Sequence, residues 1–196
     1  MNKLPTYLLD IVEDESSEVE VDFVALVDNP AIEKSFLAFA EKEIFAIVDE
    51  DEHIITGALM LADTPIYRRD QTGEYYVVFT KETIKKIAQK FFKKGYQKNV
   101  NLQHQDGSKV DGLTMFESWI VDSNRGVLAM KGFEDVPDGS WFGSFKVENE
   151  EVWALIKEGK VKGFSVEGIF NYTKKEKSKE EVMMSEIINI LSDVNK

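Results

Sequence analysis

A serine and a histidine in this sequence could together break an acyl bond without a cofactor. Ser165 lies in the decapeptide VKGFSVEGIF, residues 161–170, whose apolar residues alternate as in a half-buried strand. Because alternate residues of a strand share a face, Glu167 lies on the same face as Ser165. His104 ends the strand-like segment NVNLQH, just before a turn rich in Asp and Gly. Serine hydrolysis needs an attacking hydroxyl, a neighbouring base and donors for the oxyanion, and histidine is the usual base because it changes protonation near neutral pH.

These residues do not by themselves establish a hydrolase. A serine and a carboxylate on a strand also fit a plain solvent-facing surface, and a lone histidine in a hairpin is more often an ordinary polar residue. The segment GFSVEG lacks the Gly-x-Ser-x-Gly spacing of the α/β-hydrolase nucleophile turn, so that class is excluded. Spacing and periodicity alone leave two alternatives open, a hydrolase or an α+β domain without catalysis.

No metal site and no cofactor are expected. Two scattered histidines and no cysteine cannot form a zinc centre without several carboxylates. The acidic run DEDE, residues 49–52, lacks the spacing of a calcium loop and predicts a solvated turn. The segment DQTGEYY contains a glycine but no phosphate-cradling pattern.

Composition narrows the class of protein further. The chain has 196 residues, of which 43% are hydrophobic, and a formal net charge of −12. Such a charge disfavours nucleic acid and anionic membrane as partners, because phosphate binding needs clustered Lys and Arg. The absence of cysteine excludes disulfides and a thiol nucleophile. The chain contains no long apolar run, and its start turns acidic too early for a secretory signal, so we expect a soluble, intracellular protein.

The apolar patterns predict about seven short strands and two helices. Thr80 can cap the first helix, which Gly95 ends, and Asn149 can cap the second, which Gly159 ends. The predicted strands lie in VDFVALV, EIFAIV, HIITGALML, EYYVVFT, NVNLQH, GLTMFESWIV and the decapeptide, and GVLAMKGF is a further candidate. Mostly hairpin connections favour an α+β fold with a largely antiparallel sheet that closes in part into a barrel.

Three regions follow from the changes in composition. Residues 1–20 are expected to form a flexible acidic lead-in, and residues 21–173 the main domain. Residues 174–196 begin as a charged linker and end in an amphipathic helix, with Met184 and Leu191 on its apolar face.

Several segments, taken in order, resemble a known family. They are VALVDNPAIE near the start, NLQHQ and FESWIV in the middle, and GSWFGSFKV and VWALIKEGKVKGFSVEGIF near the end. Together they are similar to the prohead maturation serine proteases of tailed phages, in the branch found in defective Bacillus prophages. The similarity runs from about Val21 to Phe170. The resemblance implies the fold of herpesvirus assemblin, a strand-rich barrel with surrounding helices, whose serine lies on a strand.

The resemblance also implies roles for the residues. The family's G-x-S matches Gly163 to Ser165, and its n-x-x-H matches Asn101 to His104, so Ser165 becomes the nucleophile and His104 its base.

The third catalytic residue and the oxyanion donors are less well defined. The segment VALVDNPA precedes the serine here and follows it in better-known relatives, so the chain resembles a circular permutation of them. The family's glutamate falls on Phe23, and we favour its neighbour Asp22, which needs a β-bulge to reach the same face. Glu167 is a candidate for orienting the substrate or His104, Asp111 and Glu117 are weaker candidates, and a dyad stays open. None of the three arginines, Arg68, Arg69 and Arg125, lies in a matching motif, so backbone amides are an alternative for the oxyanion.

By resemblance, the expected function is processing of phage scaffolding protein and major capsid protein, and of the protease itself, during procapsid maturation. The expected place is the host cytoplasm, inside the assembling procapsid, and a homodimer stays open. The rival interpretation is a catalytically inactive structural or scaffold-associated assembly protein with the same fold.

Overall fold

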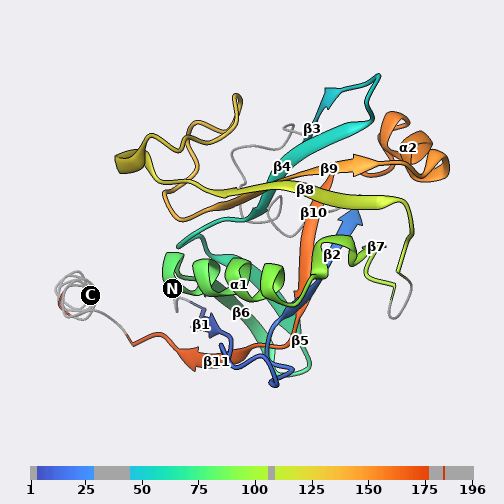
Figure 1. Ribbon diagram of the computed structural model, residues 1–196. Coiled ribbons are helices and arrows are strands. Elements are labelled where there is room, and N and C mark those ends of the chain that lie inside the picture. Colours follow the sequence, from blue (N-terminus) through green and yellow to red (C-terminus); the bar gives the residue numbers. More distant parts are fainter. Residues whose placement is uncertain (1–3, 29–44, 106–108, 177–182, 184–196) are drawn as a thin grey trace, which may run out of the picture.

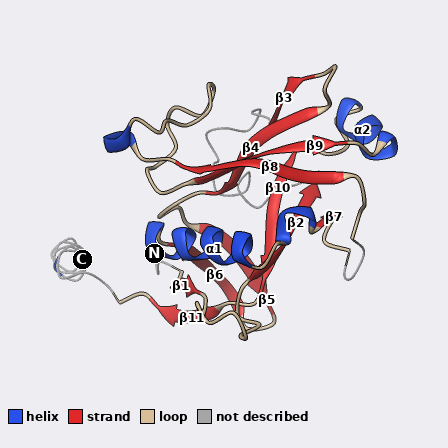
Figure 2. Cartoon of the chain, viewed as in Figure 1, coloured by secondary structure: helices blue, strands red, loops and turns tan. Residues whose placement is uncertain are grey.

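The chain folds as α+β, with strands in the majority and two α-helices, as the sequence predicts (Figures 1 and 2). The computed structural model describes residues 4–28, 45–105, 109–176 and 183. Within these residues eleven strands form three sheets, and six of the eight strand pairings are antiparallel. None of the described helices is both long and apolar enough to cross a membrane.

The smallest sheet carries the residues singled out above. Its strand order is β10-β2-β7, with β10 antiparallel and β7 parallel to the central strand β2. In Figure 1, β10 and β2 run together from the lower sheet to the upper one. The bounds are β2 Val21–Val27, β7 Val100–Leu102 and β10 Gly163–Gly168.

The upper sheet in Figure 1 has the order β3-β4-β9-β8 and is antiparallel throughout. Its first pair is the hairpin that the sequence predicts on either side of the acidic turn. The bounds are β3 Phe45–Asp49, β4 Ile54–Met60, β8 Leu113–Ile120 and β9 Trp141–Val147.

The lower sheet has the order β11-β1-β6-β5, in which β1 is parallel to β6 and antiparallel to β11. The bounds are β1 Thr6–Asp10, β5 Ile66–Asp70, β6 Gly73–Phe79 and β11 Asn171–Lys174. Between the described strands all three sheets stay open, so the partly closed barrel expected from the sequence is not confirmed.

Both predicted helices form with the predicted caps. Helix α1, Lys81–Lys93, begins where the Thr80 side chain accepts a hydrogen bond from the Thr83 N–H. Helix α2, Glu150–Lys157, begins in the same way at Asn149. Short 3₁₀ helices follow at two further places, Tyr96–Lys98 and Ser123–Arg125.

The described part of the lead-in, residues 4–20, contains a strand where the sequence suggested a flexible segment. Strand β1 lies inside the lower sheet, and the residues after it wrap around a lysine of α1. The Lys90 Nζ, 3% exposed, donates to the carbonyls of Val12, Asp14 and Ser17 at 2.8–2.9 Å and lies 2.8 Å from the Glu20 carboxylate. This buried cation supplies donors to the backbone of an acidic segment, which Leu9 and Ile11 also anchor in the hydrophobic core.

Two further predictions concern the GVLAMKGF segment and the C-terminal helix. The strand predicted in GVLAMKGF is wrong, because residues 126–133 form turns and irregular backbone apart from an isolated bridge between Val127 and Asp122. Ala129, Met130 and Phe133 pack against the cluster around Phe142. The amphipathic helix predicted near the C-terminus lies outside the described residues, apart from Met183.

Candidate functional site

The Phe164 side chain anchors strand β10 in the hydrophobic core. Phe164 is fully buried, with its ring 4.8 Å from that of Phe145 and 5.3 Å from that of Phe45, centroid to centroid. With Phe164 directed into the core, alternation sends Ser165 and Glu167 to the opposite face. The sequence prediction of a shared face for these two residues agrees with this placement.

His104 lies on the same sheet, in a tight turn after β7. Gln103 and His104 are consecutive non-glycine residues in the left-handed region, with φ of 54° and 53°. Such residues cost about 1–3 kcal/mol each and cluster at active sites and ligand clamps. The turn is held by backbone hydrogen bonds from Gln103 N–H to Leu26 and from Gln105 N–H to Leu102. It folds the imidazole back over the sheet.

Glu167 joins β10 to β7 across the central strand. One carboxylate oxygen, Oε1, lies 2.7 Å from His104 Nδ1 and accepts a 2.7 Å hydrogen bond from Asn101 Nδ2. Asn101 is 2% exposed and lies in the same row as Ser165, with Ala25 between them on β2. Because alanine is small, the longer Glu167 side chain can cross over β2 to reach both partners.

The contact fixes the protonation of the imidazole. An ionised carboxylate only accepts hydrogen bonds, so His104 Nδ1 must carry the proton that it shares with Glu167. In the neutral imidazole the lone pair is then on Nε2, which is the arrangement that a general base requires. The His104 side chain is 45% exposed, so Nε2 can be reached from solvent.

Ser165 lies on the same sheet face as this network but is not bonded to it. The residue is 8% exposed, and among the described residues its hydroxyl has no hydrogen bond to His104 or to any other group. The structure thus brings together His104, Glu167 and Asn101, and puts Ser165 on the same face without closing the Ser-His contact.

Asp22 lies at a β-bulge of the kind that the sequence analysis required. The register of β10 and β2 shifts between Glu167 and Gly168, which pair with Phe23 and Val21, so Asp22 is the extra residue. Gly168 permits the shift, because a Cβ there would overlap the backbone of Glu20. Burial raises the pKa of the Asp22 carboxyl, and the nearby charges of Glu20 and Glu167 raise it further. Among the described residues, however, the acid in contact with His104 is Glu167.

The weaker candidates lie elsewhere. Glu117 on β8 accepts a hydrogen bond from Ser144 in the upper sheet. Asp111 precedes β8, and its carbonyl accepts a hydrogen bond from the Asn149 side chain. Arg125 pairs with Asp122 in the turn after β8. In the described part of the chain no group of three His, Asp or Glu side chains could hold a metal ion.

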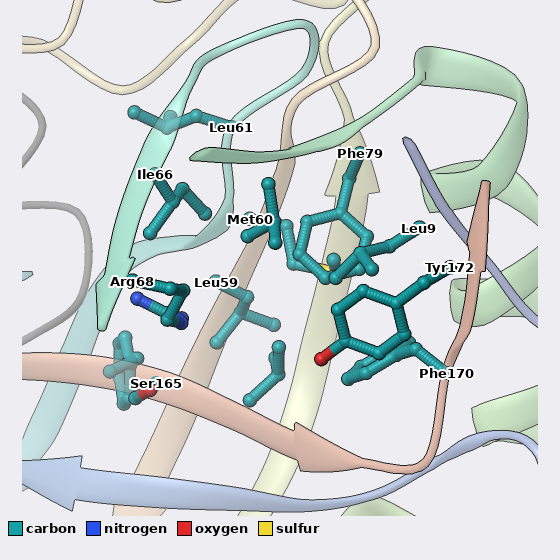
Figure 3. Close-up of a pocket in the computed structure, with 13 residues that line it drawn as sticks. Leu9, Leu59, Met60, Leu61, Ile66, Arg68, Phe79, Ser165, Phe170 and Tyr172 are labelled. Atoms are coloured by element: carbon teal, nitrogen blue, oxygen red, sulfur yellow. The ribbon is translucent and has the colours of Figure 1, made fainter. Parts of the chain in front are cut away.

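A pocket opens beside Ser165, on the edge of β10 that faces away from β2 (Figure 3). Its cavity volume is about 80 Å³, and part of the pocket is open to solvent. Its walls come from β1, β4, β5, β6, β10 and β11, and most lining side chains are apolar. Arg68 on β5 is the charged residue of the lining. The sequence analysis did not predict that Arg68 lines a pocket, because the pocket is formed by six strands and the residues around Arg68 in the sequence give no sign of it.

Comparisons with known proteins place the chain in a family. Residues 41–174 match the family described as "Putative phage serine protease XkdF". This chain therefore belongs to that family of phage serine proteases, as the resemblance in the sequence implied. His104, Ser165 and Glu167 lie within the matched residues, and Asp22 precedes them.

One relative is the phage-like element PBSX protein XkdF of Bacillus subtilis (strain 168), which is 24% identical over 157 residues. The match covers 80% of this chain and 50% of that relative, so the chain spans about half the length of the curated protein it matches. No solved structure matches the chain.

Proposed function

We propose that this protein is a serine endopeptidase that processes scaffolding and capsid proteins, and its own chain, during phage procapsid maturation. The observation that carries the proposal is the Glu167–His104 contact on the sheet face that also bears Ser165, in a chain of a phage serine protease family. An acid that fixes the tautomer of an imidazole serves nucleophilic catalysis by a serine on the same sheet face.

In the proposed mechanism His104 Nε2 takes the proton of the Ser165 hydroxyl as the oxygen attacks the peptide carbonyl carbon. The protonated imidazole gives that proton to the leaving amine, and a water molecule, activated by the same base, releases the acyl group. Glu167 stabilises the imidazolium that forms between these steps. Glu167 thus takes the third position for which the sequence favoured Asp22, because Glu167 is the acid in contact with the imidazole.

The backbone can supply the oxyanion donors. The Val24 N–H bonds to Asn99 and the Leu26 carbonyl accepts from Gln103, so these two residues of β2 face β7. The intervening Ala25 therefore faces its partner Ser165 on β10. By alternation the N–H groups on either side of Ser165 face the pocket. The amide after the nucleophile serves as an oxyanion donor in other serine hydrolases.

Glu167→Gln is expected to slow peptide cleavage by about 10²- to 10⁴-fold, as loss of a tautomer-fixing acid does. The amide keeps the size of the side chain but can no longer hold the Nδ1 proton as a carboxylate does. The measurement is kcat on a peptide cleaved by the wild-type chain. Asp22→Asn is the matched control and should change kcat by less than about tenfold, because Asp22 does not touch His104. Equal losses in both variants would contradict the assignment of Glu167.

The processing reaction itself is tested by co-expression of the chain with the scaffolding and capsid proteins of its phage. We expect shortened partner proteins with the wild-type chain and full-length partners with Ser165→Ala. Mass spectrometry of the partners gives the cleavage points. Identical processing with both chains would end the protease proposal.

The open Ser-His contact favours one alternative. An assembly protein that retains the fold without catalysis would also carry a serine whose hydroxyl is not bonded to the imidazole. The same co-expression separates the two, since an inactive protein leaves its partners full-length while still associating with them.

A further inference from the structure

We propose that the edge of β10 that has no strand partner among the described residues, together with the adjoining pocket, binds an extended peptide segment, with Arg68 receiving an acidic side chain of that segment. This inference deepens the proposed function, because the segment would be the substrate that Ser165 attacks. It rests on the backbone of β10, the composition of the pocket and the charge of Arg68, which has no carboxylate partner in the described part of the chain.

The first observation concerns the backbone of β10. Ser165 faces β2, so Phe164 and Val166 direct their N–H and C=O groups to the other edge. On that edge β10 has no strand partner among the described residues. Unpaired groups on an edge strand bind an added strand through main-chain hydrogen bonds, and pockets beside the edge select alternate side chains. A peptide seated there would lie directly beside Ser165.

The second observation is the pocket on the same edge. Three consecutive residues of β10, Phe164 to Val166, line it, so the edge opens directly into the pocket. In Figure 3, Arg68 and Ser165 lie at one end of the pocket, and the rings of Phe170 and Tyr172 lie at the other. The apolar walls can bury the aliphatic part of a side chain, while the charged group of that side chain meets Arg68.

The third observation is the state of Arg68. Its side chain is half-buried and donates to the carbonyl of its neighbour Tyr67. No carboxylate in the described part of the chain forms an ion pair with it, although the chain has 36 acidic residues. Burial lowers the pKa of the Arg68 guanidinium, with the Tyr172 and Tyr75 rings nearby. A half-buried guanidinium whose N–H groups donate to no carboxylate in the described part of its own chain is suited to bind a carboxylate of another chain.

The chemistry therefore favours an acidic side chain over an amide or a basic one. A charge-assisted hydrogen bond in this partly dry site should favour a Glu side chain over Gln by about ten- to a hundredfold in Kd. A Lys side chain would place two cations together and should bind more weakly than either.

The test uses the full chain with Ser165→Ala, so that binding is measured without cleavage. The probes are three fluorescent nonapeptides of sequence Ala-Ala-Val-Ala-X-Ala-Val-Ala-Ala, in which X is Glu, Gln or Lys. We expect the Glu peptide to bind most tightly and to shift the Nε–H signal of Arg68 in the NMR spectrum. In the variant Arg68→Gln the Glu and Gln peptides should bind alike, and in Arg68→Glu the Lys peptide should bind best.

Arg69→Gln is the matched control, because Arg69 is the next residue of β5 and is exposed on its other face. It should leave all three affinities unchanged, and circular dichroism melting checks that every variant is folded. Equal affinity for the three peptides, or no binding by any of them, overturns the inference. Cleavage by the wild-type chain with no preference among the peptides overturns it while the proposed function stands. Arg68-dependent binding without any cleavage supports it while the proposed function fails.

Discussion

Alanine at His104 is expected to slow peptide cleavage by a factor on the order of 10⁶, alanine at Ser165 by about the same factor, and both together by no more than either alone. The reason is that the two residues perform one step. Without the imidazole the hydroxyl keeps its proton, and without the hydroxyl the imidazole has no nucleophile to activate. Single-turnover cleavage of a peptide, compared across the two single variants and the double variant, measures this coupling.

Independent effects of the two residues would contradict this coupling. If the rate factors lost in the single variants multiply in the double variant, the two residues act independently and the paired mechanism is wrong. A control is Ser140→Ala, since Ser140 is buried in another part of the fold, with its hydroxyl bonded to the Ala62 N–H. That variant should alter stability and leave the rate within about threefold.

Lys90→Met is expected to lower the free energy of unfolding by about 3–5 kcal/mol, the usual loss when a buried ion pair loses one partner. The change leaves three backbone carbonyls of residues 12–17 without their donor and leaves the buried Glu20 carboxylate with only Tyr96 and Lys94. Urea unfolding followed by tryptophan fluorescence measures the loss. Lys93→Met, on the exposed side of the same helix, should cost less than about 0.5 kcal/mol. Similar losses in the two variants would show that Lys90 does not hold the segment.

The same ion pair predicts how stability depends on pH. Burial raises the pKa of the Glu20 carboxyl, but the hydrogen bonds from Lys90, Tyr96 and Lys94 outweigh burial and hold the pKa below its usual value. Since the folded pKa is the lower one, the stabilisation is complete above the unfolded pKa of about 4.3 and is lost as the pH falls through the folded pKa. Unfolding free energies of the wild type should therefore fall more steeply below that pH than those of Glu20→Gln. Parallel curves would contradict this.

The sequence predicted the parts of the site that depend on local order. Alternation along VKGFSVEGIF is enough to put Ser165 and Glu167 on one face, and the strand β10 has that arrangement. The choice between Asp22 and Glu167 could not be made in this way. It depends on the left-handed turn at Gln103 and His104, which points the imidazole at a carboxylate two strands away. The role of Arg68 depends on a pocket assembled from distant segments.

The fold shows the same division between local and distant causes. Helix α1 was predicted correctly because its cap and apolar spacing lie within its own residues. Strand β1 was missed because its acidic surroundings suggest a flexible segment, while its order comes from pairing with β6 and β11, more than 60 residues away, and from burial of Leu9. The apolar residues of GVLAMKGF were mistaken for a strand because they pack on the Phe142 cluster from turns, and a short apolar run does not distinguish the two.

The central claim is that Ser165 is a nucleophile activated by His104, and covalent labelling tests it most directly. The full chain is treated with a fluorophosphonate, which loses fluoride as a serine oxygen bonds to phosphorus, and the adduct is located by mass spectrometry of its peptides. We predict one adduct, on Ser165, that forms far more slowly in His104→Ala. An unlabelled chain, or an adduct on any other residue, would contradict the account.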